Sequence, residues 1–138
     1  MAMNTIKLKF PDERTARRHI ETRRWHGRPT CPHCGRNEKI RRESRDGTDG
    51  YYRCSVCMKV FTVRTESIFA RSHVPLDKWL QAIRLAASFA CQRGISSPQL
   101  AYRIGVTQKT AWRMLNRIYA ARANRGGEWT WWWPTRDQ

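Results

Sequence analysis

The sequence predicts a small α+β protein, in which a rubredoxin-like four-cysteine zinc ribbon of three short antiparallel strands precedes a mainly α helix-turn-helix domain. Two Cys-x-x-Cys pairs, Cys31/Cys34 and Cys54/Cys57, predict the ribbon. A change to a helical apolar period from Leu76 onward predicts the helical part. The net charge of +16 on 138 residues indicates a strongly anionic partner.

Composition and motifs divide the chain into four segments. These are an N-terminal arm with a short helix (1–30), a zinc ribbon with its connector (31–75), the helix-turn-helix domain (76–122) and a Trp-rich tail (123–138). Hydrophobic residues make up 40% of the chain, which excludes a compositionally disordered protein. The 28% of charged residues leave room only for small cores, so we expect a bound metal to add stability.

No feature of the sequence indicates a membrane or secreted protein. Arg84 interrupts the longest apolar stretch, and residues 1–10 lack the apolar core of a signal peptide. We therefore expect a cytoplasmic protein, in a compartment where thiols stay reduced.

The first half of the chain is expected to form one helix and a small sheet. Residues 11–24 read as a short helix, because Pro11 suits a first turn and Asp12 complements the positive end of the helix dipole. The ribbon is expected to have three strands, at residues 38–45, 51–53 and 60–65. A turn at residues 46–50 is expected to join the first two strands. The first strand is highly charged, which predicts an edge strand or a partly solvated one.

The four cysteines have the spacing of a structural zinc site. Each Cys-x-x-Cys turn can present two thiolates to one ion, and four thiolates complete a tetrahedron with no open position for water. We therefore expect one structural zinc ion held by Cys31, Cys34, Cys54 and Cys57. Disulfides between these cysteines are the alternative, which a reducing cytoplasm disfavours. His33 could replace one ligand, but we expect it at the surface.

Three helices are predicted after the connector. Apolar residues from Leu76 to Ala90 recur on one helical face, and Gly94 is expected to end that helix. Ser96 and the proline that follows open a short helix to Ile104. Gly105 then allows a left-handed turn, and a third helix runs over residues 108–121.

The last helix has the side chains of a DNA-reading helix. Once its apolar residues fill the space between the helices, Gln and Asn can read adenine while Arg and Lys can read guanine. Residues 76–125 also carry nine Lys or Arg against one Asp, a positive excess suited to phosphates. An ordinary helical hairpin would not need this polar set. The expected DNA-binding residues are Gln108, Lys109, Thr110, Arg113, Asn116, Arg117 and Arg103.

Two tryptophan features allow more than one interpretation. Trp112 falls between the two faces of the last helix, and we expect it to pack on Trp79, with contact to the sugar-phosphate backbone as the alternative. Residues 129–133 hold four tryptophans, which could anchor a protein partner, dock on the ribbon or fray.

With both motifs in place, residues 10–122 resemble the N-terminal half of DDE-type insertion-sequence transposases, whose chains run zinc ribbon, helix-turn-helix and nuclease. The resemblance is carried by FPDE at 10–13, RW at 24–25, CPHCG at 31–35, YRCSVCMKVFTVRT at 52–65, SIFARSHVPLDKWL at 67–80 and GISSPQLAYRIGVTQKTAWRMLNRI at 94–118. The sequence departs from the pattern at Glu66, where a glycine is expected.

The resemblance implies a ribonuclease-H-like catalytic domain with an acidic triad, which is not evident here. Beyond Asp77 only Glu128 and Asp137 are acidic. We therefore carry over no catalytic residue, and lean toward a protein without nuclease activity.

We expect a sequence-preferring double-stranded DNA-binding or regulatory factor derived from a transposase, associated with the nucleoid. The alternative is an adaptor that uses the ribbon and the Trp-rich tail to hold RNA polymerase or a larger nuclease complex.

Overall fold

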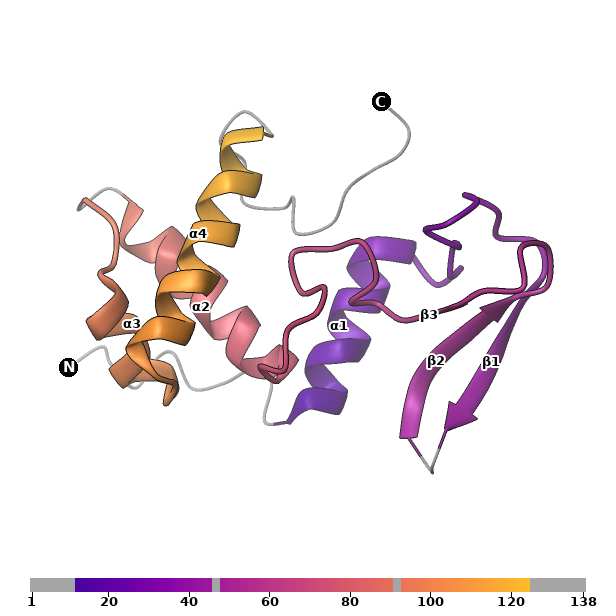
Figure 1. Cartoon of the computed structure of the whole chain (residues 1–138), viewed down its shortest axis with the longest axis horizontal. Helices are drawn as coiled ribbons and strands as arrows, with labels where there is room; N and C mark the ends of the chain where they lie inside the picture. The colour runs from indigo at the N-terminus through magenta and orange to yellow at the C-terminus, as the bar shows by residue number, and fades with distance from the viewer. Residues whose placement is uncertain (1–11, 46–47, 91–92, 125–138) are drawn as a thin grey trace. The chain divides into compact units, whose positions relative to one another are not determined.

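The computed structural model describes residues 12–45, 48–90 and 93–124, which divide into two compact units (Figure 1). Of the described residues, 17–72 form one unit, called the ribbon unit, which contains the sheet. Residues 12–16 and 73–124 belong to the other, called the helical unit. No helix among the described residues is long and apolar enough to cross a bilayer.

Helix α1 (Glu13–Trp25) confirms the helix predicted at 11–24 but begins two residues later, and it supplies the ribbon with an aromatic residue. The Asp12 carboxylate accepts a hydrogen bond from the amide of Thr15 at 2.7 Å and caps the first turn. At the other end, the Trp25 ring packs edge-on against Tyr52 and Phe61, with centroids 5.4 and 5.7 Å away. Tyr52 and Phe61 stack on each other at 5.6 Å. These three rings are the centre of the ribbon core.

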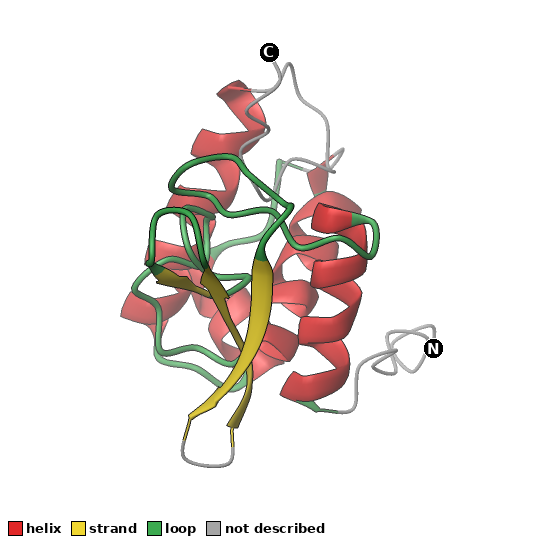
Figure 2. Cartoon of the chain, turned by 90° about the vertical axis from the view of Figure 1, so that its right-hand side faces the viewer, coloured by secondary structure: helices red, strands yellow, loops and turns green. Residues whose placement is uncertain are grey.

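The sheet is antiparallel in the order β1-β2-β3, with strands β1 (Ile40–Arg45), β2 (Thr48–Cys54) and β3 (Val60–Phe61) (Figure 2). β1 is an edge strand, as its charge predicted. The turn predicted at 46–50 is wrong for residues 48–50, because Thr48 pairs with Arg45 and belongs to β2. Residues 46–47 lie outside the described ranges.

The third strand is shorter than predicted, because side chains compete with its ladder. The strand expected over 60–65 ends at Phe61. The Thr62 hydroxyl accepts from the amide of Arg64 at 3.1 Å, and the Thr65 hydroxyl accepts from the amide of Thr62 at 3.0 Å. Such local bonds turn the chain away from an extended conformation.

The connector after the third strand contains two informative residues. Arg24 of α1 donates from Nη1 to the Val63 carbonyl at 2.8 Å, which fastens the helix to this segment. Burial lowers the pKa of Arg24 to about 10, and the Glu66 carboxylate opposes that shift. Glu66 itself has φ 52°, in the left-handed region that favours glycine. The departure noted in the sequence is therefore a residue that holds a glycine-type conformation.

Three mutually packed helices make up most of the helical unit: α2 (Leu76–Ser88), α3 (Ser97–Ile104) and α4 (Gln108–Asn124). Helix α2 ends well before Gly94, the predicted stop. The Ser88 hydroxyl donates to the Arg84 carbonyl at 2.9 Å, and Phe89 occupies the C-cap. Ala90 is consequently exposed and is not part of the apolar face assigned to it.

The turn between α3 and α4 follows the local signals of the sequence. Ser96 and Gln99 form a reciprocal capping box at the start of α3. Gly105 has φ 73° and ψ 46°, the left-handed conformation expected of it. Lys78 of α2 donates to the Gly105 carbonyl at 3.0 Å and so links α2 to the turn. Thr107 accepts from the amide of Thr110 at 3.2 Å and caps α4.

The core of the helical unit is apolar and contains residues from all three helices. It includes the expected contacts between α3 and α4, where Ile104, Ala111 and Met114 are buried. The other buried residues of this unit are Ala16, Leu76, Trp79, Leu80, Ala82, Ile83, Leu85, Ala86, Ile95, Leu100, Ala101, Leu115 and Ile118.

Candidate metal centre and nucleic-acid interface

The two Cys-x-x-Cys segments fold into matching turns. In the first, the Gly35 amide donates to the Cys31 carbonyl at 2.8 Å, and the Cys31 amide donates to the Arg36 carbonyl at 2.9 Å. In the second, the Met58 amide donates to the Cys54 carbonyl at 2.8 Å. The Cys54 amide likewise donates to a carbonyl five residues later, at 3.1 Å. Each turn therefore presents its two sulfurs in the same way.

The four sulfur atoms converge at one point between these turns. The Sγ atoms all lie within 4.8 Å of one another. The Cys31–Cys57 and Cys34–Cys54 Sγ pairs are each 3.6 Å apart. Four thiolates about 2.3 Å from one zinc ion would be roughly 3.8 Å apart in a tetrahedron. A disulfide needs about 2.05 Å, and all four cysteines are free. The arrangement fits one zinc ion and excludes the disulfide alternative.

The surroundings of the sulfurs affect the two buried thiols differently. Burial raises the pKa of Cys31 to about 12, although backbone amides of the same turn oppose the shift. The amides of Cys57 and Val56 lower the pKa of Cys54 to about 7. Amides directed at sulfur stabilise the thiolate form, which is the form that binds zinc.

The ligand set contains the cysteines alone. Cys31 and Cys54 are completely buried, while Cys34 and Cys57 are half-buried. Among the residues described, the group able to hold an ion comprises these four and does not include His33. Because four protein ligands fill a tetrahedral zinc site, the zinc has a structural role.

Helix α4 presents most of the predicted DNA-binding residues on its exposed side. Four of its apolar residues, Ala111, Met114, Leu115 and Ile118, are buried in the core. Neither α3 nor α4 contains an acidic residue, so the positive charge of this surface is not offset within these helices. The exposed polar side chains are Gln108, Lys109, Arg113, Asn116 and Arg117. We call these five residues the α4 polar face.

Two predicted residues lie apart from the α4 polar face. Thr110 is half-buried, and its hydroxyl accepts a hydrogen bond from the Thr107 hydroxyl at 2.9 Å. Thr110 therefore contributes to the N-terminal cap of α4. Arg103 belongs to α3, and its guanidinium lies over the Phe89 ring, 5.2 Å from the centroid.

Trp112 does not have the packing role expected of it. Its side chain is 57% exposed, whereas Trp79, the proposed partner, is 1% exposed. Trp79 is thus part of the core and Trp112 is part of the surface. The sequence did not distinguish them because Trp112 lies at the border of the apolar face of α4.

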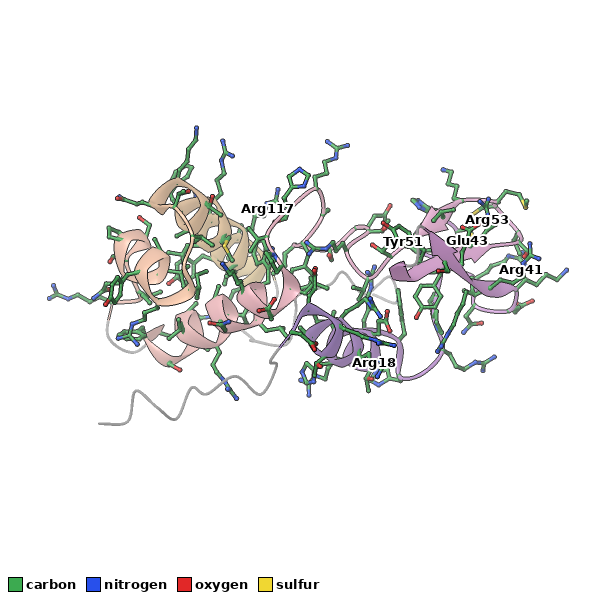
Figure 3. All side chains as sticks on the ribbon, turned by 90° about the horizontal axis from the view of Figure 1, so that it is seen from below. Arg18, Arg41, Glu43, Tyr51, Arg53 and Arg117 are labelled. Carbon is green, nitrogen blue, oxygen red and sulfur yellow. The ribbon has the colours of Figure 1, made fainter. Side chains whose placement is uncertain are left out.

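The ribbon carries a second polar surface, on the outer face of β1 and β2. Arg41 lies directly opposite Arg53, and Glu43 opposite Tyr51, so the four residues share one face. Arg53 donates to Glu43 Oε1 from Nε at 3.2 Å and from Nη2 at 3.1 Å. Figure 3 shows Glu43 and Arg53 close together on the strands. This surface was not predicted from the sequence, because β1 is polar on both faces after Ile40 and shows no alternation.

The comparisons with known proteins concern both units. Residues 11–60 match the family of transposase zinc-ribbon domains. An uncharacterized protein in the transposable element ISH50 of Halobacterium salinarum is 31% identical over 112 residues, which cover 81% of this chain. The chain spans 36% of the length of that relative. No solved structure matches the chain.

Proposed function

Residues 11–60 are a transposase zinc-ribbon domain, and from that premise we propose that the chain binds double-stranded DNA with a sequence preference. It acts as a transposase-derived DNA-binding or regulatory factor. The relative's place in a transposable element supports a role at DNA. Such a protein is located in the cytoplasm, with the nucleoid.

The α4 polar face is the main observation that supports this proposal. Two amide side chains and three cationic ones project from one helix whose opposite side is packed into a core. Amides pair with adenine and cationic groups with guanine in the major groove. The helix follows a glycine turn after α3, which is the order of elements in a helix-turn-helix protein. Gln108, Lys109 and Arg113 lie nearest the N-terminal end of α4 and supply the readout.

The ribbon unit adds affinity through the phosphate backbone. Arg41 on β1 and Arg18 and Arg23 on α1 are exposed, so their charges can reach phosphates. Contacts of this kind position a protein on the duplex without reading its sequence. The zinc ion holds the ribbon in the fold that presents them.

Selection from a random double-stranded DNA library tests the proposal. Zinc-loaded protein is mixed with the library at near-physiological salt, and the retained sequences are read. Enrichment of one motif supports sequence-preferring binding. Retention without enrichment would leave net charge as the only cause of binding and would overturn the proposal.

A second candidate function is an interaction adaptor, which two exposed apolar residues on the ribbon favour. Val56 and Met58, in the second Cys-x-x-Cys turn, are 45% and 59% exposed. Exposed apolar side chains beside one another are frequent in protein interfaces. The Trp-rich tail, which is predicted to serve the same function, lies outside the described residues.

Pull-down with two variants separates the adaptor from the DNA-binding factor. One variant is truncated after Arg125, and the other carries Val56→Ser. Loss of a protein partner with unchanged DNA affinity supports the adaptor. Unchanged DNA affinity of both variants, with no partner captured by the wild type, argues for the first proposal alone.

A further inference from the structure

Trp112 is the largest side chain on the exposed side of α4, and the α4 polar face does not account for it. It lies in the second turn of the helix with 57% of its surface exposed. Residues three and four apart are neighbours on a helix surface. Trp112 is therefore next to Gln108 and Lys109 on one side and to Asn116 on the other. Its indole occupies the same surface as the groups proposed to read bases.

An apolar ring on a base-reading surface needs an apolar group on the DNA. Among the unmodified bases, the major groove offers one such group, the C5 methyl of thymine. We propose that Trp112 contacts a thymine C5 methyl, so that the recognised site has a thymine adjacent to the bases read by Gln108 and Lys109. The inference rests on the proposed binding of DNA through α4.

The position of Trp112 along the helix supports this assignment. Helical side chains lean toward the N-terminus, so the indole lies over the turn that contains Gln108. In helix-turn-helix proteins the N-terminal residues of the second helix approach the base edges. A phosphate requires a donor directed at the backbone, and the indole offers a single N–H on a mostly apolar surface. Its area suits a methyl group better than a phosphate.

The charge around Trp112 favours DNA over an apolar protein partner. The neighbours Lys109 and Arg113 are exposed and cationic, and neither α3 nor α4 has an acidic residue to offset them. An apolar partner would have to cover these charges and remove them from water, which is costly. A duplex offers phosphates to the charges and a methyl group to the ring.

Substitution of thymine by deoxyuridine in the selected site tests the proposal directly. Deoxyuridine lacks the C5 methyl and keeps the hydrogen-bonding groups of thymine. Each thymine is replaced in turn and the dissociation constant of the wild-type chain is measured. One replacement is expected to weaken binding about fourfold, the value for losing one buried methyl group. This arm uses the wild-type protein alone and does not depend on a variant that folds.

A variant then assigns the methyl contact to Trp112. The Trp112→Ala variant should bind the site equally well with thymine or deoxyuridine at that position. Its affinity for both should be close to that of the wild type for the deoxyuridine form. Tyr102→Ala is the matched control, because Tyr102 is an exposed aromatic residue on α3, with 90% of its surface accessible. It should keep the wild-type response to deoxyuridine.

Several results would overturn the proposal. One is a selected site without thymine, and another is a site at which no deoxyuridine replacement changes the affinity. If Trp112→Ala weakens binding but keeps the deoxyuridine effect, the ring rests on the sugar-phosphate backbone. If Trp112→Ala changes only the capture of a protein, the ring belongs to a protein interface. Absence of any enriched motif would instead overturn sequence-preferring binding, and is detected before deoxyuridine is used.

Discussion

Met58 occupies in the second Cys-x-x-Cys turn the position that Gly35 occupies in the first. Both residues have a left-handed backbone, with φ 62° for Met58 and 79° for Gly35. Both amides donate to the carbonyl of the first cysteine of their turn at 2.8 Å. The turn that holds two zinc ligands thus requires a conformation that glycine adopts without strain and methionine does not. Met58 is also exposed, so core packing does not explain its side chain.

Met58→Gly should therefore stabilise the zinc-loaded ribbon. Glycine relieves the strain of the left-handed backbone, but it also gives the unfolded chain more conformational freedom, which opposes the gain. The free energy of unfolding is expected to rise by about 0.5–1 kcal/mol. Urea unfolding followed by fluorescence measures it. Val56→Ala removes a neighbouring exposed apolar side chain that has no positive φ, and should change the stability by less than about 0.5 kcal/mol. A loss of stability in Met58→Gly would show that the side chain makes a stabilising contact.

Zinc removal should unfold the ribbon and leave the helical unit largely folded. Four aromatic rings and a few aliphatic residues form the ribbon core, whereas α2, α3 and α4 share a core of their own. Structural zinc contributes about 10–16 kcal/mol in small zinc-binding peptides. On chelation, circular dichroism should retain most of its helical signal while the fluorescence reports exposure of Trp25.

The same prediction can be made with variants. Cys54→Ser should lower the zinc content from one ion per chain, and Ser55→Ala, beside it, should not. Metal analysis by mass spectrometry checks this. Full zinc occupancy in Cys54→Ser would contradict the four-cysteine site.

The stability of the ribbon should depend on pH through Glu21. Burial raises the pKa of Glu21 above its usual 4.5, against the effects of Arg17 and Tyr52. The folded state therefore binds this proton more tightly than the unfolded state. The stability from Glu21 is complete below its unfolded pKa and is lost as the pH rises through the folded pKa. Glu21→Gln removes this loss and should gain stability over the wild type as the pH rises.

Urea midpoints of both proteins are compared from about pH 4.5, where the loss begins, to about pH 8. Excess zinc is present throughout, because acid displaces zinc from thiolates. Glu38→Gln, at an exposed position, controls for the loss of one negative charge. A Glu21→Gln variant that is equally less stable at every pH would indicate that its hydrogen bonding outweighs its desolvation.

Arg113→Ala and Arg103→Ala should affect DNA binding differently. Arg113 lies on the α4 polar face, so its loss is expected to cost about 1–3 kcal/mol and to relax the preference at one base position. Arg103 belongs to α3 and lies over the Phe89 ring, and its loss should weaken binding to all DNA sequences alike. Library selection with each variant provides the comparison. Unchanged selection by Arg113→Ala would rule out its role in readout.

Gly105→Ala should destabilise the helical unit through its backbone alone. A Cβ at this position would meet nothing closer than Lys78 Nζ at 3.7 Å, an ordinary contact. Its φ of 73° is nevertheless unfavourable for alanine, and the expected cost is about 1 kcal/mol or slightly more. Thermal unfolding measures it. Gly105→Asn, which tolerates this conformation better, should recover part of the loss.

Several features of this protein could be predicted from the sequence because they depend on neighbours along the chain. The two Cys-x-x-Cys turns, the Ser96 capping box and the left-handed Gly105 are each defined within about six residues. The same holds for the existence of α1, although its cap at Asp12 was not predicted. The four zinc ligands were identified from spacing alone, since each turn fixes two of them.

The errors lie where local signals compete. The strand predicted over 60–65 stops at Phe61, because the hydroxyls of Thr62 and Thr65 bind backbone amides nearby. The helix predicted to reach Gly94 ends at Ser88, with Phe89 at its C-cap, so the apolar period did not locate the helix end. Periodicity describes which face is apolar but does not weigh these bonds.

The sequence by itself determined the metal ligands, the order of the elements and the polar side of α4, all of which follow from spacing and helical period. The tertiary structure decided which border residues are covered. Trp112 and Trp79 are chemically alike, yet one is exposed and the other buried, because burial depends on what other helices place against a side chain. The pairing of Glu43 with Arg53 likewise required the register of two strands, which sets Glu43 opposite Tyr51 and so places it diagonally across from Arg53 on the same face.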